Sequence, residues 1–358
     1  MKIAIVLGTR PEIIKMSPVI RECKKRKIDF FIIHTNQHYS EKMDSTFFEE
    51  LKLPQAKYNI GISNESLQGR MIAKMLIGIE KILIDEKPDW VLVEGDTNTV
   101  LAGALASRKL GIRLGHLEAG LRSYDNSMPE ETNRIITDHI SDLLFAPTKK
   151  QRNILLKEGI NKEKIYVTGN TIVDAVFQNL VLAKKRVTIN TPEDKNYFTL
   201  TMHRPSNVDD KKTLRDILKS LEESSKKLRV PIFFFVHPRT RHNLFKFKIK
   251  IDQKLIKLIP PVGYLEMLKA EQNSKLILTD SGGLQEEACI LKVPCVTLRK
   301  NTERPETIDI GSNVLAFDTK VPLSKIIKSA LAKKNSWKNP YGKGKTGEKI
   351  IDIIMKYA

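Results

Sequence analysis

The sequence predicts an α/β protein made of two doubly wound parallel sheets. Two observations lead to this prediction: short apolar runs alternate with helical patterns from end to end, and the 358 residues are too many for one ordinary hydrophobic core. Strands that are apolar throughout, each followed by a helix, are typical of parallel sheets that helices cover on both faces. We therefore expect two such domains facing each other across a cleft.

Candidate strands and helices alternate in the first half of the chain. Strands are expected at residues 2–7, 30–34, 90–93, 113–117, 143–146 and 165–168. Helices are expected at residues 11–26, 67–85 and 97–110. Pro11 suits the first turn of the first of these helices.

The same alternation continues in the second half. Strands are expected at residues 197–201, 232–236, 276–278, 295–298 and 314–317, and helices at residues 211–227, 265–272, 284–291 and 322–333. The expected domains are residues 1–168 and 169–340, with a polar surface connection at 188–196 and a Pro-, Gly- and Lys-rich break at 335–345. A final helix at 346–357 follows the break and can pack on either domain.

Composition and charge exclude several classes of protein. Hydrophobic residues make up 41% and charged residues 29%, which is typical of a soluble globular protein. No apolar run approaches the roughly 20 residues that span a bilayer, so a cytoplasmic protein without membrane contact is expected. The net charge of +19 comes mostly from scattered lysines, which favours a solvated basic surface over a nucleic-acid partner. Cys23, Cys289 and Cys295 lack the spacing of a metal site, so no metal is expected.

Functional-looking side chains collect after three expected strands of the first half. Residues 8–12 read Gly-Thr-Arg-Pro-Glu, residues 94–97 read Glu-Gly-Asp-Thr, and residues 118–122 read Glu-Ala-Gly-Leu-Arg. Ligands of open parallel sheets bind at the carboxyl ends of strands, so these groups are expected to lie close together. The first turn has no G-x-G-x-x-G pattern, and we therefore expect no nicotinamide cofactor.

Single residues of this group also have structural interpretations. Asp96 can be a helix cap, and Glu130 and Glu131 suit the first turn of a helix. Glu130 and Arg134 have the spacing of a surface ion pair. Taken together, three carboxylate positions at one edge of a sheet favour a catalytic role.

In the second half, residues 279–283 (Thr-Asp-Ser-Gly-Gly) join a strand to a helix expected from Leu284. The backbone N–H groups of such a turn, with the positive end of the helix, suit a phosphate. Glu287, one turn further, can accept hydrogen bonds from a ribose or simply point into water. His203 and Arg304 follow other strands, where they can hold a diphosphate or form ordinary ion pairs.

These motifs together resemble the non-hydrolysing UDP-N-acetylglucosamine 2-epimerases. The matching stretches are G-T-R-P-E at 8–12, G-D-T at 95–97, H-L-E-A-G-L-R at 116–122, P-E-E at 129–131, T-D-S-G-G-L-Q-E-E at 279–287 and T-E-R-P-E at 302–306. They follow the family's order and spacing over nearly the whole chain. The resemblance implies the GT-B architecture, two Rossmann-like domains with the active site between them, a final helix that returns to the first domain, and a homodimer.

The resemblance also implies the reaction and its residues. UDP-N-acetylglucosamine and UDP-N-acetylmannosamine are interconverted by elimination of UDP to a 2-acetamidoglucal and its re-addition, without a cofactor. Asp96, Glu118, Glu130 and His203 resemble catalytic residues. The positions that resemble substrate contacts are Arg10, Lys15, Asp96, Glu118, His203, Val262, Met267, Ser281, Gly282, Gly283, Glu287 and Arg304.

Three departures from the family pattern are visible. Ser206 stands where the family often has an acid, and Val262 and Met267 stand where some members carry Gln and Phe. The stretch from Gln37 and His38 to Tyr39 and Ser40 matches only loosely the region that binds a second, activating UDP-sugar in bacterial members.

Two other activities on the same nucleotide sugar remain open. A GT-B glycosyltransferase would share the fold and the Ser-Gly-Gly turn, but the acids of the first domain make it less suitable. A hydrolysing 2-epimerase would release free N-acetylmannosamine and UDP. The sequence also leaves open a 3-acylamino or uronic-acid form of the sugar.

Overall fold

The computed structural model describes residues 1–37, 41–62, 65, 67–186, 192, 195–317 and 321–357. The chain divides into an N-terminal unit, Met1–Gln178 with Tyr341–Ala358, and a C-terminal unit, Asn179–Pro340. The division falls inside helix α7 (Thr171–Arg186), whereas the sequence pattern suggested a boundary near residues 168–170. Part of the connection expected at 188–196 lies outside the described residues.

The N-terminal unit contains a parallel sheet whose strands, among the described residues, run in the order β3-β2-β1-β4-β5-β6-β7. The strands are β1 (Lys2–Leu7), β2 (Asp29–His34), β3 (Tyr58–Asn59), β4 (Trp90–Glu94), β5 (Arg113–Leu117), β6 (Leu143–Ala146) and β7 (Ile165–Val167). The order reverses between β1 and β4, so the turns that follow these two strands flank the topological switch point.

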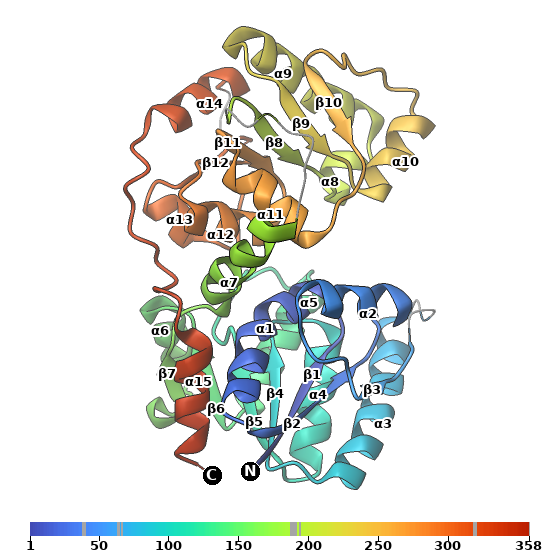
Figure 1. Ribbon diagram of the computed structural model, residues 1–358, viewed down its shortest axis with the longest axis vertical. Helices are drawn as coiled ribbons and strands as arrows, with labels where there is room; N and C mark the ends of the chain where they lie inside the picture. Colours follow the sequence, from blue (N-terminus) through green and yellow to red (C-terminus); the bar gives the residue numbers. More distant parts are fainter. Residues whose placement is uncertain are drawn as a thin grey trace. The chain divides into compact units, whose positions relative to one another are not determined.

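Helices cover both faces of this sheet (Figure 1). The helices of this unit are α1 (Arg10–Lys25), α2 (Glu41–Glu50), α3 (Gln68–Glu86), α4 (Asn98–Lys109), α5 (Pro129–Ile140), α6 (Lys149–Lys157) and α15 (Thr346–Met355), and the first part of α7 also belongs to it. The last helix, α15, packs against α1, and Arg26 pairs with Asp352 at 2.6 Å between Nη1 and Oδ1. Both chain ends therefore lie in the N-terminal unit.

The C-terminal unit repeats the architecture with the described strand order β10-β9-β8-β11-β12-β13, again entirely parallel. The strands are β8 (Phe198–Thr201), β9 (Ile232–Phe235), β10 (Ile256–Ile259), β11 (Leu276–Thr279), β12 (Cys295–Thr297) and β13 (Asn313–Leu315). The helices are α8 (Pro205–Val208), α9 (Lys211–Leu228), α10 (Pro238–Lys246), α11 (Tyr264–Gln272), α12 (Gly282–Leu291), α13 (Pro305–Asp309) and α14 (Leu323–Ala332). The predicted class, α/β with two doubly wound sheets, is confirmed.

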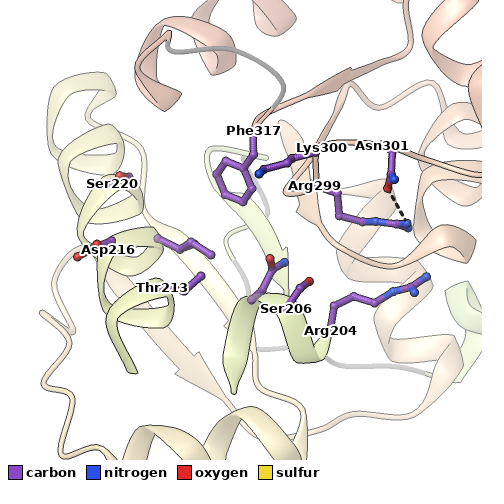
Figure 2. Close-up of a pocket in the computed structure, with 11 residues that line it drawn as sticks. Arg204, Ser206, Thr213, Asp216, Ser220, Arg299, Lys300, Asn301 and Phe317 are labelled. Atoms are coloured by element: carbon purple, nitrogen blue, oxygen red, sulfur yellow. Dashed lines mark hydrogen bonds between the residues drawn. The ribbon is translucent and has the colours of Figure 1, made fainter. Parts of the chain in front are cut away.

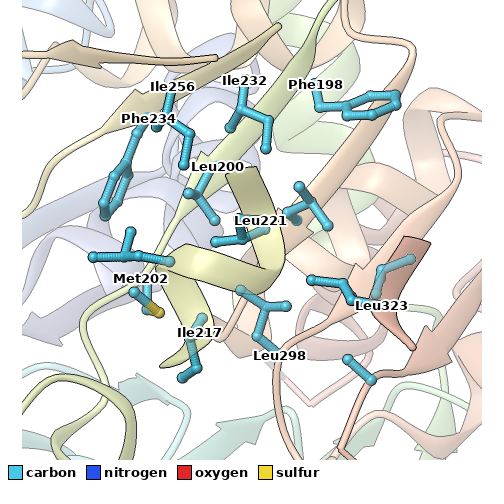
Figure 3. Packing of buried hydrophobic residues seen from close by; sticks show 14 of the residues in the cluster. Phe198, Leu200, Met202, Ile217, Leu221, Ile232, Phe234, Ile256, Leu298 and Leu323 are labelled. Carbon is cyan, nitrogen blue, oxygen red and sulfur yellow. The ribbon is translucent and has the colours of Figure 1, made fainter. Parts of the chain in front are cut away.

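The main core of the C-terminal unit lies between its sheet and the helices α9 and α14 (Figure 3). Leu200 of β8 and Phe234 of β9 are fully buried there, and Leu221 of α9 packs on them. These side chains come from apolar strands and from one stripe of an amphipathic helix, which is why the sequence pattern located both elements.

Two strands, β3 and β10, were missed by the sequence analysis, and both are edge strands. Strand β3 spans only Tyr58–Asn59. Strand β10 carries Lys257 within a lysine-rich segment, and two of its four side chains are exposed. An edge strand pairs on one side only and has no need of a continuous apolar run, so its pattern is weak. None of the described helices has the length and apolar character needed to cross a membrane.

Candidate active site

The turn after β1 fixes the start of helix α1. The Oε2 atom of Glu12 accepts hydrogen bonds from the backbone N–H groups of Gly8 (2.6 Å) and Thr9 (2.8 Å), which completes a capping box. Burial raises the pKa of Glu12 to about 7, against the effect of its hydrogen bond from Thr97. This anchored first turn directs the next turn of α1, with Lys15, toward the carboxyl end of β4.

The loop after β5 holds Glu118 in an unusual conformation. Glu118 has a φ of +64°, and Gly120, two residues later, has a φ of +83°. A Cβ at Gly120 would lie 2.6 Å from the carbonyl oxygen of Gln151, so only glycine fits there. The buried Glu118 side chain accepts hydrogen bonds from Lys15 Nζ (2.6 Å) and from Asn170 Nδ2 (2.7 Å).

A buried network that the sequence analysis missed supports this loop. Asp138 of α5 lies 2.7 Å from His116 Nδ1 and accepts hydrogen bonds from Arg122 Nη1 (2.7 Å) and from the N–H of Gly120 (3.1 Å). The other ring nitrogen of His116 lies 2.8 Å from the carbonyl oxygen of Gly95. The H-L-E-A-G-L-R motif thus contains the groups that position Glu118, and Asp138 is recognisable only once α5 is folded against it.

The acids around α5 are arranged differently from the spacing-based expectation. Arg134 pairs with Asp96 and, at 2.7 Å, with Glu131, so the suggested pair with Glu130 is wrong. Glu131 is buried and also accepts hydrogen bonds from the backbone N–H groups of residues 123 and 124, whereas Glu130 is exposed. The cap of α4 is Thr97 rather than Asp96. Asp96 and Glu130 therefore remain accessible acids, and Glu131 is a structural one.

Glu94, the last residue of β4, is a second acid that the sequence analysis did not select. Its side chain is 2% exposed, and its Oε1 lies 3.2 Å from Lys15 Nζ. Burial raises the pKa of Glu94 well above its ordinary value, with Lys15 opposing and Glu118 reinforcing the shift. The sequence alone places Glu94 at a strand end but does not reveal that the side chain turns inward to share the contact of Glu118.

Two expected binding regions of the N-terminal unit are only partly described. The Arg10 guanidinium lies over the ring of Phe47, 5.4 Å from its centre. Gln37 is buried, and its Oε1 accepts a hydrogen bond from Thr99 Oγ1 at 2.8 Å. His38, Tyr39 and Ser40, where a second UDP-sugar was considered, lie outside the described residues.

In the C-terminal unit, helix α12 begins two residues earlier than predicted. Ser281 is its N-cap, and Gly282 and Gly283 form its first turn instead of a preceding loop. An ideal Cβ on either glycine would meet no atom within 4 Å, so open space lies beside the first turn. The free N–H groups of a helix N-terminus attract anions, and two glycines let a ligand approach this backbone closely.

Asp280 joins the ends of β8 and β11. This fully buried carboxylate accepts hydrogen bonds from the backbone N–H groups of His203 (2.9 Å) and Arg204 (2.8 Å) and from Asn207 Nδ2 (3.0 Å). It also lies 3.2 Å from His203 Nδ1. Although burial opposes the shift, these contacts lower the pKa of Asp280. Asp280 therefore orients the His203 ring, which is partly exposed.

The environment of Glu287 excludes the interpretation that it points into water. Glu287 is buried on α12, where it faces Tyr264 and Glu271 of α11. Burial raises the pKa of Glu271 well above its ordinary value, and the charge of Glu287 adds to the shift.

The remaining predicted contacts of this unit are also packed against protein groups. Arg304 Nε lies 2.9 Å from Glu286 Oε1, so an ion pair is present. Val262 and Met267 are half-buried and pack against a small apolar cluster that contains Phe233. The substrate roles of all these residues stay predictions.

A pocket of about 740 Å³ opens between α8, α9 and the segment after β12 (Figure 2). Arg204, Arg299 and Lys300 line it, together with Ser206. Glu303 pairs with Arg299 at 2.7 and 2.9 Å, and although burial opposes the shift, Arg299 lowers the pKa of Glu303 to about 2. Asp216 also lines the pocket, so its lining carries three cationic side chains and one acid, an excess of positive charge.

Comparison with known proteins connects this geometry with a family. A family model described as UDP-N-acetylglucosamine 2-epimerase matches residues 21–355. Curated UDP-N-acetylglucosamine 2-epimerases of Methanocaldococcus jannaschii and Methanococcus maripaludis are 56% and 55% identical, over 99% of this chain and 99% and 98% of theirs.

A solved structure agrees with the sequence relatives. The crystal structure of the Methanocaldococcus jannaschii enzyme, in complex with UDP-GlcNAc and UDP, superposes with a TM-score of 0.90 at 56% identity, over 99% of this chain and 100% of that one. The resemblance and the GT-B type of fold expected from the motifs are thereby confirmed. The chain belongs to the UDP-N-acetylglucosamine 2-epimerase family.

Proposed function

We propose that this protein catalyses the reversible, non-hydrolysing epimerisation of UDP-N-acetylglucosamine to UDP-N-acetylmannosamine at C2. The observation that carries the proposal is the cluster of Glu118, Glu94 and Lys15 at the switch point of the N-terminal sheet. Acids that are buried beside a single cation are suited to move protons, and family membership supplies the substrate class.

The proposed reaction has two halves. In the first, a carboxylate accepts the proton from sugar C2, the C1–C2 double bond forms, and UDP leaves with the electron pair of the C1–O bond. In the second, a proton is returned to the other face of C2, and a phosphate oxygen of UDP attacks C1. No water is consumed, so UDP and the 2-acetamidoglucal recombine to the epimer.

The residues of the N-terminal unit are proposed to carry the proton steps. Among the three proposed catalytic acids, Glu118 is the one whose two carboxylate oxygens both accept hydrogen bonds from side chains. Asp96 and Glu130 have accessible side chains and are the other two proposed catalytic acids. Arg10 and Lys15 are proposed to bind the substrate from the same sheet edge.

The residues of the C-terminal unit are proposed to hold the nucleotide. The first turn of α12, with Ser281, Gly282 and Gly283, suits the diphosphate because helix N-termini attract anions. Glu287 is proposed to bind the ribose, and Val262 and Met267 to lie against the base. His203 and Arg304 are proposed to stabilise the charge on departing UDP.

Incubation with UDP-N-acetylglucosamine alone, followed by separation of the products, tests the proposal. The expected product is UDP-N-acetylmannosamine, formed without added NAD. Free N-acetylmannosamine with UDP would instead identify a hydrolysing enzyme, and conversion only with an added acceptor would identify a glycosyltransferase. Parallel incubations with 3-acylamino and uronic-acid UDP-sugars identify the preferred substituents.

We also propose an oligomeric state, from the family resemblance, and a location, from the sequence pattern. A homodimer is expected, and light scattering on the purified protein measures its mass directly. A cytoplasmic location is expected as well. Fractionation of cells that express the protein, followed by an activity assay of each fraction, tests this expectation. When a sample of active enzyme is denatured and its supernatant is examined, no nicotinamide is expected there.

A further inference from the structure

Asp138, an acid of α5, contacts the loop that carries Glu118. Its side chain is fully buried, and its Oδ2 atom accepts hydrogen bonds from the N–H of Gly120 (3.1 Å) and from Arg122 Nη1 (2.7 Å). Both donors follow Glu118 directly along the same loop. One carboxylate oxygen therefore holds the backbone that presents this proposed catalytic acid.

The ring of His116 extends the contact to the turn after β4. Its Nδ1 lies 2.7 Å from Asp138 Oδ1, and its Nε2 lies 2.8 Å from the carbonyl oxygen of Gly95. That carbonyl belongs to the peptide bond between Gly95 and Asp96, another proposed catalytic acid. A second side chain of α5, that of Asn133, donates from Nδ2 to the carbonyl oxygen of Asp96 at 3.0 Å. The peptide groups on both sides of Asp96 are thus tied to α5.

The acceptors on the two sides of the ring define the protons of His116. A carbonyl oxygen can only accept, so the hydrogen bond to Gly95 needs a proton on Nε2. The contact between Nδ1 and Asp138 Oδ1 needs a proton as well. The two donors on Asp138 Oδ2 favour an ionised carboxylate, which places this second proton on Nδ1. His116 is only 1% exposed, so both of its partners are protein groups.

The charges around the ring are paired. Asp138 faces the protonated ring directly. Arg122, the other cation on Asp138, has a second carboxylate partner in Glu158, at 2.8 Å from its Nε and 2.6 Å from its Nη2. His139 lies 3.4 Å from the same carboxylate of Glu158 and is half-exposed. Buried charges are retained where such partners are present, and each of the two buried cations has one.

We propose that Asp138 is a positioning residue for two of the proposed catalytic acids. Through a His116 ring that carries both protons it holds the turn of Asp96, and through its Oδ2 atom it holds the loop of Glu118. Its helix also carries the third proposed acid, Glu130, in the first turn. The catalytic meaning of this arrangement rests on the proposed function, whereas the hydrogen bonds and the protons of the ring are properties of the folded protein alone.

Nuclear magnetic resonance of the full chain, isotope-labelled at the histidine nitrogens, tests the proton arrangement without any substrate. The chain has seven histidines, and the signals of His116 are those that disappear in His116→Asn. In the wild type at neutral pH, both ring nitrogens of His116 should carry protons. In Asp138→Asn the new amide can donate to Nδ1, so only Nε2 should remain protonated. A wild-type ring with one protonated nitrogen, or a ring that keeps both protons in Asp138→Asn, would overturn the proposal.

Turnover measures the positioning role. Asp138→Ala should lower kcat by about 10²-fold, the loss expected when catalytic groups are misplaced by about 1 Å. UDP affinity should stay near that of wild type, because the proposed nucleotide contacts belong to the other unit. Asp138→Asn should recover most of the lost kcat, since its amide oxygen can accept from Gly120 and Arg122 while its amide nitrogen donates to His116. A near-normal kcat in Asp138→Ala, or no recovery in Asp138→Asn, would contradict this role.

Asp142→Ala is the matched control. Asp142 accepts hydrogen bonds from the N–H of Leu114 (2.9 Å) and from Arg108 Nη1 (2.8 Å), the same kinds of partner that Asp138 has. These contacts lie at the amino end of β5, whereas the proposed catalytic acids follow the carboxyl ends of the strands. Asp142→Ala should lower the melting temperature and leave the kcat of the folded enzyme unchanged. An equal loss of kcat in Asp142→Ala and Asp138→Ala would count against a specific role of Asp138.

If Asp138→Ala does not fold, His116→Asn decides. Asparagine places an N–H close to the position of Nδ1 but does not reach the carbonyl oxygen of Gly95, so it keeps the contact with Asp138 and releases the turn of Asp96. Its kcat should fall while UDP affinity is retained, and an unchanged kcat would disprove the link. If the purified protein does not epimerise UDP-N-acetylglucosamine, the proposed function fails, while the magnetic resonance result still decides which protons His116 carries.

Discussion

The Nζ atom of Lys15 lies 2.6 Å from Oε2 of Glu118, and this contact joins helix α1 to the loop after β5 over a separation of 103 residues. Both residues are presented by turns that special backbone features fix: the Glu12 capping box before Lys15, and positive φ at Glu118. The contact brings a cation and an acid together at the switch point of the sheet. It is the structural basis of the first prediction.

Glu118→Gln is expected to lower the epimerisation rate by roughly 10²–10⁴, because glutamine keeps the shape of the side chain but cannot carry a proton. UDP affinity should remain close to that of wild type, since the proposed diphosphate contacts of α12 are unchanged. Rate, calorimetric UDP affinity and thermal melt are measured together. Asp125→Asn removes an exposed acid of the same unit and should change none of them. A stable, UDP-binding Glu118→Gln with near-normal rate would remove Glu118 from the catalytic group.

Gly282→Ala separates stability from binding. The added methyl group meets no protein atom within 4 Å, and alanine in a helix is favoured over glycine by about 0.5–1 kcal/mol, so the fold should become slightly more stable. UDP affinity should nevertheless fall, because the methyl group occupies the space proposed for the diphosphate. Gly69→Ala is the matched control, since Gly69 is also helical and surrounded by open space. Equal UDP affinity in both variants would argue against this site.

Glu287→Ala is expected to weaken UDP binding by about 1.5–3 kcal/mol, as for the loss of hydrogen bonds to a charged group. Since Glu287 contributes to the raised pKa of Glu271, its removal also relieves a like-charge contact, and the fold should stay intact. Calorimetry measures the UDP affinity, and a thermal melt measures the stability of the fold. Asp309→Ala, an exposed acid of the same unit, is the control. Unchanged affinity with an intact fold would show that Glu287 is a structural residue.

The Glu303–Arg299 pair predicts a pH dependence of stability. The pKa of Glu303 is lowered from 4.5 to about 2, so its ionised form stabilises the fold above pH 4.5, and this contribution is lost as the pH falls toward about 2. Glu303→Gln should therefore melt below wild type at neutral pH, with the gap closing across that acidic window. Asp216→Asn, which removes an exposed acid, should leave a small gap that does not change with pH. A constant gap for Glu303→Gln would contradict the assignment.

Elimination and re-addition make a prediction about solvent exchange. When the reaction is run in D2O, deuterium should enter C2 of both sugars, because the proton removed from C2 exchanges with solvent before it is replaced. Mass spectrometry and proton NMR of the separated sugars measure the incorporation. Epimerisation that keeps the original hydrogen at C2 would rule out this mechanism.

The sequence by itself determined the class of fold and the positions of most core elements. Continuous apolar runs such as Leu143–Ala146, followed by helical patterns, are typical of strands in a covered parallel sheet, and β6 occupies the predicted residues. The motifs also determined the family, because their order and spacing are local properties of the chain. The edge strand β10 was missed because two of its four side chains are exposed, so its sequence is not a continuous apolar run.

The tertiary structure decided which acids are buried and which partners they have. Glu130 and Glu131 are equivalent in the sequence, yet Glu131 turns inward to Arg134 and Glu130 remains exposed. Glu94 becomes the neighbour of Glu118 only because β4 and β5 pair in register. Burial and charge pairing arise from residues far apart in the chain, so pKa values are properties of the folded sheet rather than of any motif.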